Sequence, residues 1–204
     1  NHHVQPFHGE DFQMFERGVP GKDKYSEVNY VSPLPLETCD TINHSWGYNA
    51  RDKSFKSTKT LIHYLVTTAG YNANFLLNVG PMPDGRIQPE FVQRLKEIGK
   101  WLAQNGESIY GTSSGPMPPQ DWGVTTQKKG NVYVHILKTP GDKIVSMPNM
   151  AGIQIQKASL LQSGKAVTFN RKNDRLELKI PENSIDAVDT IVVLKLGKKQ
   201  ESNI

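Results

Sequence analysis

The sequence predicts an α/β layer followed by an all-β antiparallel sandwich. Between residues 57 and 105 a helix pattern, a continuous apolar strand and a second helix pattern alternate, which is the order of an α/β layer or a (β/α) barrel. Past a stretch rich in Ser, Gly and Pro at residues 112–120, six short β-rich runs follow, as in an antiparallel sandwich. The 204 residues, 36% of them hydrophobic, suffice for one large domain or two small ones.

Residues 1–56 are irregular and rich in Pro, Gly, Asn and His, with strand-like pieces at Ser26–Val31 and Leu36–Ile42. A loop-heavy stretch of this length is unusual in a compact domain unless it is functional. The first predicted helix covers Ser57–Ala69, because Ser57 suits an N-cap and Gly70 a stop. The side chains predicted on its buried face are Leu61, Leu65, Val66 and Ala69.

A near-continuous apolar run at Asn74–Val79 predicts a strand buried on both faces, as in a parallel sheet. The second predicted helix covers Pro89–Asn105, since Pro suits the first helical turn and Gly106 ends the pattern. The side chains predicted on its buried face are Phe91, Leu95, Ile98 and Leu102.

Turn signals separate the six β-rich runs, and two of the runs alternate with a period of two, which is typical of strands with one buried face. We place the α/β domain at residues 1–112 and the sandwich domain at 113–204, with the linker at about 112–120. The predicted sandwich strands are Trp122–Thr126, Asn131–Leu137, Lys143–Ser146, Ala166–Phe169, Arg175–Ile180 and Thr190–Leu196.

Composition and charge exclude several classes of function. The net charge is +4, but the basic residues are scattered among acids, so we expect no nucleic-acid partner. No apolar stretch approaches the roughly 18 residues of a membrane span, and none is expected. The single cysteine, Cys39, cannot form an intramolecular disulfide. The sequence opens without an initiator Met or a signal-peptide pattern, so we expect a fragment or a processed product.

Acidic residues gather in the N-terminal stretch at Glu10, Asp11 and Glu16, with Glu37 further along. A glycosidase needs a pair of carboxyl groups, one as proton donor and one as nucleophile or base. Judged by their number alone, these acids are better explained as solvated or capping carboxylates.

Histidines and one tryptophan are the other candidate binding groups. His2, His3 and His8 lack the spacing of a zinc site and a cysteine partner, so we expect hydrogen-bonding histidines and no metal. Trp46 follows the strand predicted at Leu36–Ile42 in a polar loop. It could stack on a sugar at the carboxyl end of a barrel strand, or it could cover the top of the core.

Four ordered blocks within residues 1–112 resemble those of glycoside hydrolase family 29, the α-L-fucosidases. The Asn74–Pro81 block (NFLLNVGP) is the most specific of them. The blocks are Gly9–Glu16 with Pro20-Gly21, Leu36–Cys39 with Ser45–Tyr48, Asn74–Pro81 with Asp84-Gly85, and Gly99–Leu102 with Asn105–Glu107 and Ile109-Tyr110.

The resemblance implies that residues 1–112 form the C-terminal portion of a (β/α)8-type barrel and that the family's β-sandwich follows. It also implies hydrolysis of terminal α-L-fucose from glycans by a retaining mechanism, without a cofactor. Glu16 is the implied acid/base, in a loop whose mobility would let it approach the leaving group, and Glu37 is the competing candidate. The implied substrate-binding residues are Trp46, Glu37, His2 and His3.

The implied partners are a fucosylated glycan and the missing N-terminal half of the barrel. That half would hold the nucleophile, so we expect this chain alone to be inactive. The alternative is a non-catalytic carbohydrate-binding or packing module. The residues leave the compartment open, whereas the resemblance suggests a periplasmic, secreted or lysosomal location.

Overall fold

The computed structural model describes residues 8–18, 34–149 and 153–197. The chain divides into two compact units, the first ending at Gly106 and the second beginning at Glu107. The expected strand at Ser26–Val31 and the candidate residues His2 and His3 lie outside the described residues. Within the described ranges, no helix has the length and apolar character that crossing a membrane requires.

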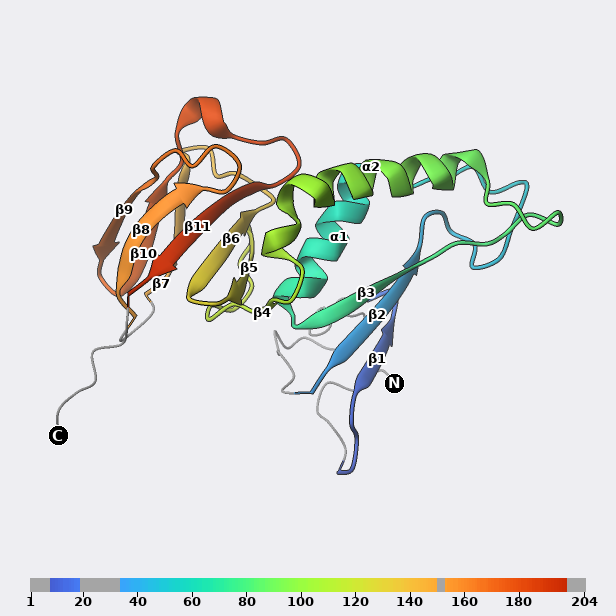
Figure 1. Ribbon diagram of the computed structural model, residues 1–204, viewed down its shortest axis with the longest axis horizontal. Helices are drawn as coiled ribbons and strands as arrows, with labels where there is room; N and C mark the ends of the chain where they lie inside the picture. The colour runs from blue at the N-terminus through green and yellow to red at the C-terminus, as the bar shows by residue number, and fades with distance from the viewer. Residues whose placement is uncertain (1–7, 19–33, 150–152, 198–204) are drawn as a thin grey trace. The chain divides into compact units, whose positions relative to one another are not determined.

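The first unit contains a parallel sheet with the order β1-β2-β3 (Figure 1). Its strands are β1 (Gln13–Glu16), β2 (Leu36–Thr41) and β3 (Ala73–Asn78). The strand predicted at Leu36–Ile42 is therefore confirmed as β2, whereas β1 was not predicted. Four residues are too short for a recognisable period, and β1 exists through its pairing with β2, which aligns Gln13 with Leu36.

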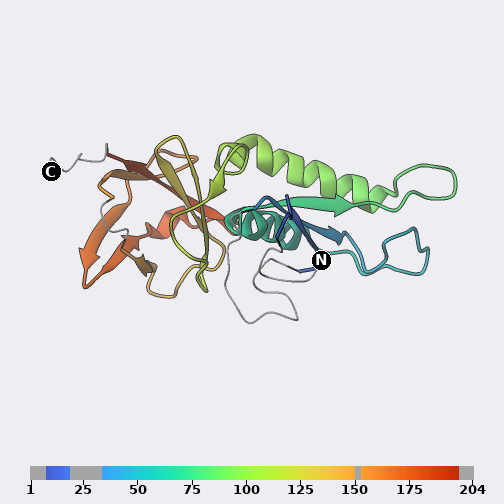
Figure 2. The same cartoon turned by 90° about the horizontal axis from the view of Figure 1, so that it is seen from below.

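Helix α1 (Thr58–Gly70) confirms the first predicted helix. The Ser57 hydroxyl accepts a hydrogen bond from the Thr60 backbone N–H at 3.0 Å, as an N-cap should. Both views place α1 beside β3 (Figure 1, Figure 2), and the rings of Tyr64 and Phe75 lie 4.7 Å apart between their centroids. The helix thus covers the face of the sheet to which Phe75 belongs.

The opposite face of the sheet is uncovered in the described part of the chain, and here one prediction was wrong. Strand β3 was expected to be buried on both faces, yet Leu76 is 47% exposed. Because neighbouring residues of a strand point to opposite faces, Phe75 meets α1 while Leu76 points away from it. A continuous apolar run does not reveal whether both sides of a strand are covered.

Helix α2 (Pro89–Asn105) has the predicted bounds. Its buried face differs from the prediction at two positions, because Leu95 is 40% exposed and Leu102 is only partly buried, whereas Trp101 is buried. Arg94 takes the inward position, and its Nε donates to the Lys56 carbonyl at 2.9 Å. The buried residues of α2 are Phe91, Ile98, Trp101 and Asn105.

The second unit is an antiparallel sandwich of a five-stranded sheet, β4-β5-β6-β11-β8, and a three-stranded sheet, β7-β10-β9. Buried side chains from both sheets form its core, including Val134, Leu178 and Leu194. Its strands are β4 (Ser113–Ser114), β5 (Gly123–Lys128), β6 (Asn131–Ile136), β7 (Ile144–Pro148), β8 (Ile155–Leu160), β9 (Thr168–Lys172), β10 (Arg175–Lys179) and β11 (Thr190–Leu196).

All six predicted sandwich strands are present, and two further strands were missed. Strand β4 lies in the expected linker and has only two residues. In β8 the buried residues Ile155 and Ala158 are three apart, because the pairing register with β11 shifts near Leu196. An irregularity of this kind removes the period of two on which strand prediction depends.

A buried polar chain crosses the five-stranded sheet. The Thr126 hydroxyl donates to the Ser108 carbonyl at 2.6 Å and lies 3.2 Å from His135 Nε2. His135 Nδ1 lies 2.7 Å from Asp189 Oδ2, and both side chains are fully buried. These hydrogen bonds join β5, β6 and the segment before β11.

Candidate functional site

The two candidate carboxylates share the uncovered face of the β1-β2-β3 sheet. The register aligns Met14 with Glu37 and Asn74 at one level, and Glu16 with Cys39 and Leu76 at the next. Side chains on one face recur every second residue, so all of these belong to the face opposite α1. We call this set the carboxylate face: Met14, Glu16, Glu37, Cys39, Asn74 and Leu76.

Glu16 and Glu37 lie at different depths on the carboxylate face. Glu16 is the last residue of β1, whereas Glu37 is the second residue of β2 and pairs with Met14. Two residues of strand separate the levels, which corresponds to about 6.6 Å along the sheet. Glu16 therefore lies at the carboxyl end of the strands, where barrel proteins build their sites, and Glu37 lies deeper.

The segment that carries Glu16 is anchored, which corrects the expectation of a mobile loop. Strand β1 ends in Glu16, and the Arg17 backbone N–H donates to the Cys39 carbonyl at 2.9 Å. The Gly18 carbonyl accepts from the Thr38 hydroxyl at 2.5 Å and from the Tyr64 hydroxyl at 3.1 Å. The parallel pairing of β1 with β2 fixes the backbone position of Glu16. The four residues of β1 are too few for the sequence to reveal this pairing.

Cys39 lies at the level of Glu16 on the carboxylate face. Partial burial raises the pKa of its thiol, and the negative charges of Glu16 and Glu37 raise it further. Because the thiolate is the nucleophilic form of cysteine, this thiol is a poor nucleophile at neutral pH. The chemistry of this face therefore depends on its carboxylates.

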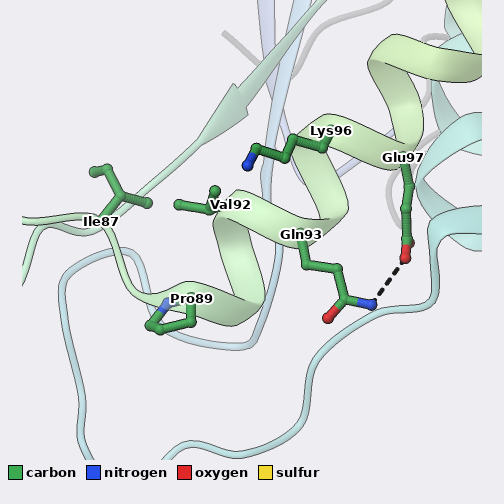
Figure 3. A pocket seen from close by; sticks show the side chains of 6 residues that line it. All are labelled: Ile87, Pro89, Val92, Gln93, Lys96 and Glu97. Carbon is green, nitrogen blue, oxygen red and sulfur yellow. Dashed lines mark hydrogen bonds between the residues drawn. The ribbon is translucent and has the colours of Figure 1, made fainter.

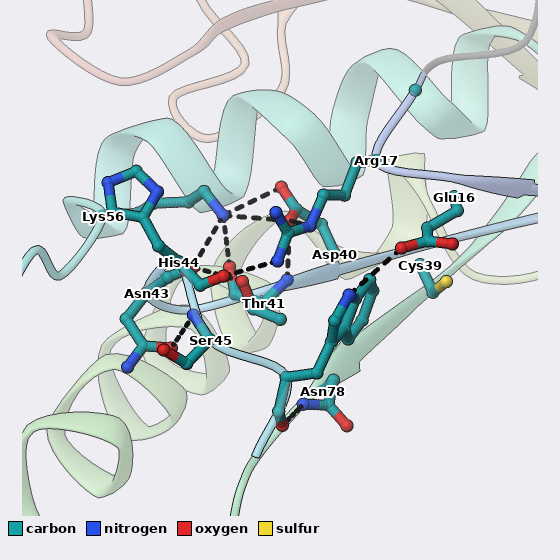
Figure 4. Close-up of polar contacts among 12 residues, drawn as sticks. Glu16, Arg17, Cys39, Asp40, Thr41, Asn43, His44, Ser45, Lys56 and Asn78 are labelled. Carbon is teal, nitrogen blue, oxygen red and sulfur yellow. Dashed lines mark hydrogen bonds and ion pairs between the residues drawn. The ribbon is translucent and has the colours of Figure 1, made fainter. Parts of the chain in front are cut away.

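Trp46 meets Glu16 across 30 residues of sequence (Figure 4). Its indole Nε1–H donates to Glu16 Oε1 at 3.1 Å. The side chain is 37% exposed, so the ring does not lie inside the core. The Arg17 guanidinium carbon lies 4.9 Å from the centroid of the ring, within the range of a cation–π contact.

Asn78, the last residue of β3, and Gly80, just after that strand, hold the backbone of the Trp46 loop. The Asn78 side-chain amide donates to the Trp46 carbonyl at 2.7 Å (Figure 4). A Cβ atom at Gly80 would lie 2.6 Å from both the Gly47 carbonyl carbon and the Tyr48 nitrogen. Only glycine permits this approach of two backbones. Residues of the Asn74–Pro81 block thus hold the backbone of the loop that carries Trp46 in place.

Asp52 closes the same loop from its other end. Its carboxylate accepts from the His44 backbone N–H and the Ser45 hydroxyl, both at 2.9 Å, and from the Ser54 N–H at 3.1 Å. Desolvation acts to raise the pKa of Asp52, but these hydrogen bonds together outweigh it and leave the pKa below its ordinary value. The ionised carboxylate therefore stabilises the loop.

A charged cluster behind the loop escaped sequence reasoning. Lys56 Nζ donates to Asp40 Oδ1 and to the Thr41 carbonyl at 3.0 and 2.5 Å, and Arg17 Nε lies 3.9 Å from Asp40 (Figure 4). Asn78 was quoted only as part of a block and was not assigned a role. Its place near the end of the strand predicted at Asn74–Val79 was the available signal.

Two further candidate acids lie beside Met14 of the carboxylate face. Glu10 and Asp11 line a shallow hollow of about 300 Å³ together with Phe12 and Met14. Across the described residues, no group of three or more His, Cys, Asp or Glu side chains could hold a metal ion. A larger hollow of about 550 Å³ lies beside α2 (Figure 3) and contains no residue of the carboxylate face. Its lining residues are Ile87, Pro89, Val92, Gln93, Lys96 and Glu97.

The described chain thus combines a carboxylate and an indole at the carboxyl ends of parallel strands with an antiparallel sandwich, which is the arrangement of a barrel protein that carries a β domain. The family model described as Alpha-L-fucosidase matches residues 1–107, just over half of the chain. The chain belongs to the α-L-fucosidase family.

Known relatives agree with this placement. An α-L-fucosidase of Dictyostelium discoideum is 36% identical over 67% of this chain and 32% of its own length. The plasma α-L-fucosidase of Rattus norvegicus is 30% identical over 87% of this chain and 39% of its own length. The chain thus spans about a third of the length of the curated relatives it matches.

Solved structures extend the likeness to both units. The α-L-fucosidase isoenzyme 1 from Paenibacillus thiaminolyticus is 33% identical, with a TM-score of 0.78 over 92% of this chain and 45% of that protein. An α-L-fucosidase from Bacteroides thetaiotaomicron is 25% identical, with a TM-score of 0.81 over 95% of this chain and 44% of that protein. The predicted fold class, the C-terminal part of a (β/α)8-type barrel followed by an antiparallel sandwich, is confirmed.

Proposed function

We propose that this chain forms part of a retaining α-L-fucosidase that hydrolyses terminal α-L-fucose from glycans. The observation that carries the proposal is the contact of the Trp46 indole with the Glu16 carboxylate at the carboxyl end of β1. A carboxyl group beside an exposed aromatic ring can give a proton to a glycosidic oxygen while the ring lines the sugar. The fucosylated glycan is the proposed substrate.

Glu16 is the proposed acid/base, and its position favours it over Glu37. Glu16 lies at the strand end, where a leaving group can reach it, and Glu37 lies one level deeper beside Asn74. The proposed role of Glu37 is to hold the sugar or neighbouring groups in place. Trp46 is proposed to form an apolar wall of the sugar site, using the part of the ring that Arg17 does not cover.

The proposed reaction has two steps. A carboxylate from a barrel strand outside these 204 residues attacks the anomeric carbon, and the bond to the leaving oxygen breaks as Glu16 gives that oxygen its proton. Water then attacks the anomeric carbon of the covalent intermediate, Glu16 takes its proton, and the first carboxylate leaves. Because Oε1 of Glu16 accepts from the indole, the transferable proton belongs on Oε2.

Relatives support both parts of this scheme. A family 29 α-L-fucosidase from Bacteroides thetaiotaomicron, 25% identical to this chain, has been solved as a trapped covalent intermediate with 2-fluoro-fucosyl fluoride in a Glu-to-Gln variant. This chain covers 43% of that protein. The proposed partner is therefore the remainder of a barrel, which would supply the nucleophile.

The test uses the enzyme that contains this chain together with its remaining barrel strands. Loss of a general acid harms substrates with poor leaving groups most, because those substrates need the proton. Glu16→Ala should lose activity in proportion to the pKa of the leaving group, and added azide should restore turnover. Azide attacks a β-linked intermediate from the opposite face, so the expected product is the α-fucosyl azide.

Glu37→Ala is the matched control, and it should show neither the leaving-group dependence nor the azide product. If Glu37→Ala shows both and Glu16→Ala shows neither, the two roles are exchanged. A β-fucosyl azide from Glu16→Ala would instead mark Glu16 as the nucleophile and contradict the proposal.

A further inference from the structure

Arg17 directly follows Glu16 and has an unusual backbone. Its φ angle is +51°, in the left-handed region that residues other than glycine adopt rarely. The Arg17 N–H still pairs with the Cys39 carbonyl at 2.9 Å, so the strand pairing reaches this residue before the chain turns. The backbone therefore holds Arg17 in a defined place beside Glu16.

The guanidinium of Arg17 is held on several sides. Its Nη2 donates to the His44 carbonyl at 2.5 Å, and its Nε lies 3.9 Å from Asp40 Oδ1 (Figure 4). Asp40 is itself fixed by Lys56 Nζ at 3.0 Å and by the Thr41 backbone N–H at 2.7 Å. The planar cation is thereby anchored by groups of β2 and of the segment that follows it.

The fixed cation lies over the indole of Trp46, with 4.9 Å between the guanidinium carbon and the ring centroid. Asn78 holds the backbone carbonyl of Trp46, so the position of the ring depends on its torsion angles and on what it packs against. A guanidinium over the ring restricts those torsions. The restricted ring directs its N–H to Glu16 Oε1.

We propose that Arg17 is a positioning residue for Glu16, acting through the ring of Trp46. By holding the indole against Oε1, it leaves Oε2 to carry the proton toward the leaving group. This inference rests on the proposed role of Glu16 as acid/base. A lysine has the charge but lacks the planar fork that reaches both His44 and Asp40.

The test compares Arg17→Met with Arg17→Lys in the complete enzyme, with Arg86→Met as matched control. Arg86 forms an exposed ion pair with Asp84 and is not one of the residues of the carboxylate face. Each variant is assayed on two fucosides, one with an alkyl alcohol and one with dinitrophenol as leaving group. Arg17→Met should lose about tenfold or more in kcat/KM on the alkyl fucoside and less than about twofold on the dinitrophenyl fucoside.

Two further readouts separate positioning from a general loss of structure. Arg17→Met should shift the fluorescence emission of Trp46, identified by its absence in Trp46→Phe, and Arg17→Lys should restore part of both the emission and the activity on the alkyl fucoside. In a Glu16→Ala background, Arg17→Met should add no leaving-group-dependent loss, because a positioning residue cannot act on a missing group.

Equal losses of Arg17→Met on both fucosides, or an additional leaving-group-dependent loss in the Glu16→Ala background, would overturn the inference. A different result would reject the proposed function of Glu16 itself. If Glu16→Ala by itself shows no leaving-group dependence, Glu16 is not the acid and the role of Arg17 toward it is rejected as well. If Glu16→Ala shows that dependence and Arg17→Met does not, only the positioning role is rejected.

Discussion

The two units of the molecule differ in how far the faces of their sheets are buried. In the sandwich, two sheets bury their apolar faces against each other, and Leu178 in the middle of β10 is fully buried. In the α/β unit, α1 covers one face of the sheet, and Leu76 in the middle of β3 is 47% exposed on the other. The same residue type in the same kind of element therefore has a different role in each unit.

The polar groups of the two units differ in the same way. The sandwich buries His135 and Asp189 where no substrate can reach them. The α/β unit presents Glu16, Trp46 and Arg17 at the ends of its strands. The comparison indicates that burial in the second unit contributes stability, whereas incomplete burial in the first leaves groups free for chemistry.

The largest expected difference between the units comes from a pair of Leu→Ala substitutions. Leu178→Ala should destabilise the sandwich by about 3 kcal/mol, because it removes buried methyl groups and leaves a cavity. Leu76→Ala should cost less than about 1 kcal/mol, since much of that side chain already meets solvent. Hydrogen exchange resolved by residue, with urea titration, measures each unit separately. Similar losses of stability for the two variants would contradict the expected difference in burial between the units.

The buried polar chain of the sandwich gives the next effect. Asp189→Ala leaves His135 Nδ1 buried without its partner, which should cost about 2 kcal/mol of sandwich stability. The matched control is Asp121→Ala at an exposed position of the same unit, which should leave the unfolding midpoint unchanged. Equal effects of the two substitutions would show that the buried pair contributes nothing specific.

In the α/β unit, the corresponding polar test is Lys56→Met. The substitution keeps most of the aliphatic chain and removes the donor that Asp40 and the Thr41 carbonyl share. The expected loss is about 1 kcal/mol, because the group is partly exposed to solvent, which weakens its interactions. Hydrogen exchange of β2 measures it, with the sandwich amides as the internal reference. Slower exchange in β2 would contradict the expected stabilisation by Lys56.

The smallest effect concerns the pH dependence of the Trp46 loop. The hydrogen bonds to Asp52 leave its pKa in the folded protein below the ordinary value despite desolvation. The ionised carboxylate therefore stabilises the loop fully above the unfolded pKa of about 3.9, and this stabilisation is lost as the pH falls through the lower folded pKa. Trp46 emission should therefore change in acid. Asp52→Asn should show the changed emission at neutral pH already, and an unchanged emission would contradict the role of Asp52.

Local signals explain which elements could be predicted. Helix α2 was predicted with its bounds because Pro89 and Gly106 mark its ends in the sequence itself. The sandwich followed from its turns and its period of two. Strand β1 and strand β8 were missed because one exists only through its pairing and the other contains an irregularity.

The site was predictable in part, for a related reason. Glu16, Glu37 and Trp46 were named as candidates, but the shared face of the two carboxylates depends on strand register, which the sequence does not display. The hydrogen bond from Trp46 to Glu16 joins residues 30 positions apart. Arg17 carried no signal, since its contacts arise from a left-handed backbone and from a neighbour on another strand.

The contact of Gly80 with the Gly47-Tyr48 backbone has a consequence for any redesign of the proposed sugar site. Position 80 touches no substrate in the proposed scheme, yet any side chain there would displace the loop that carries Trp46. In a library that randomises the neighbourhood of Trp46, every variant that replaces Gly80 should therefore have a displaced Trp46 loop. If the proposed sugar site is correct, its preference can be altered through the outward side chains of the loop, while the backbone contact beneath them limits how far the loop can move.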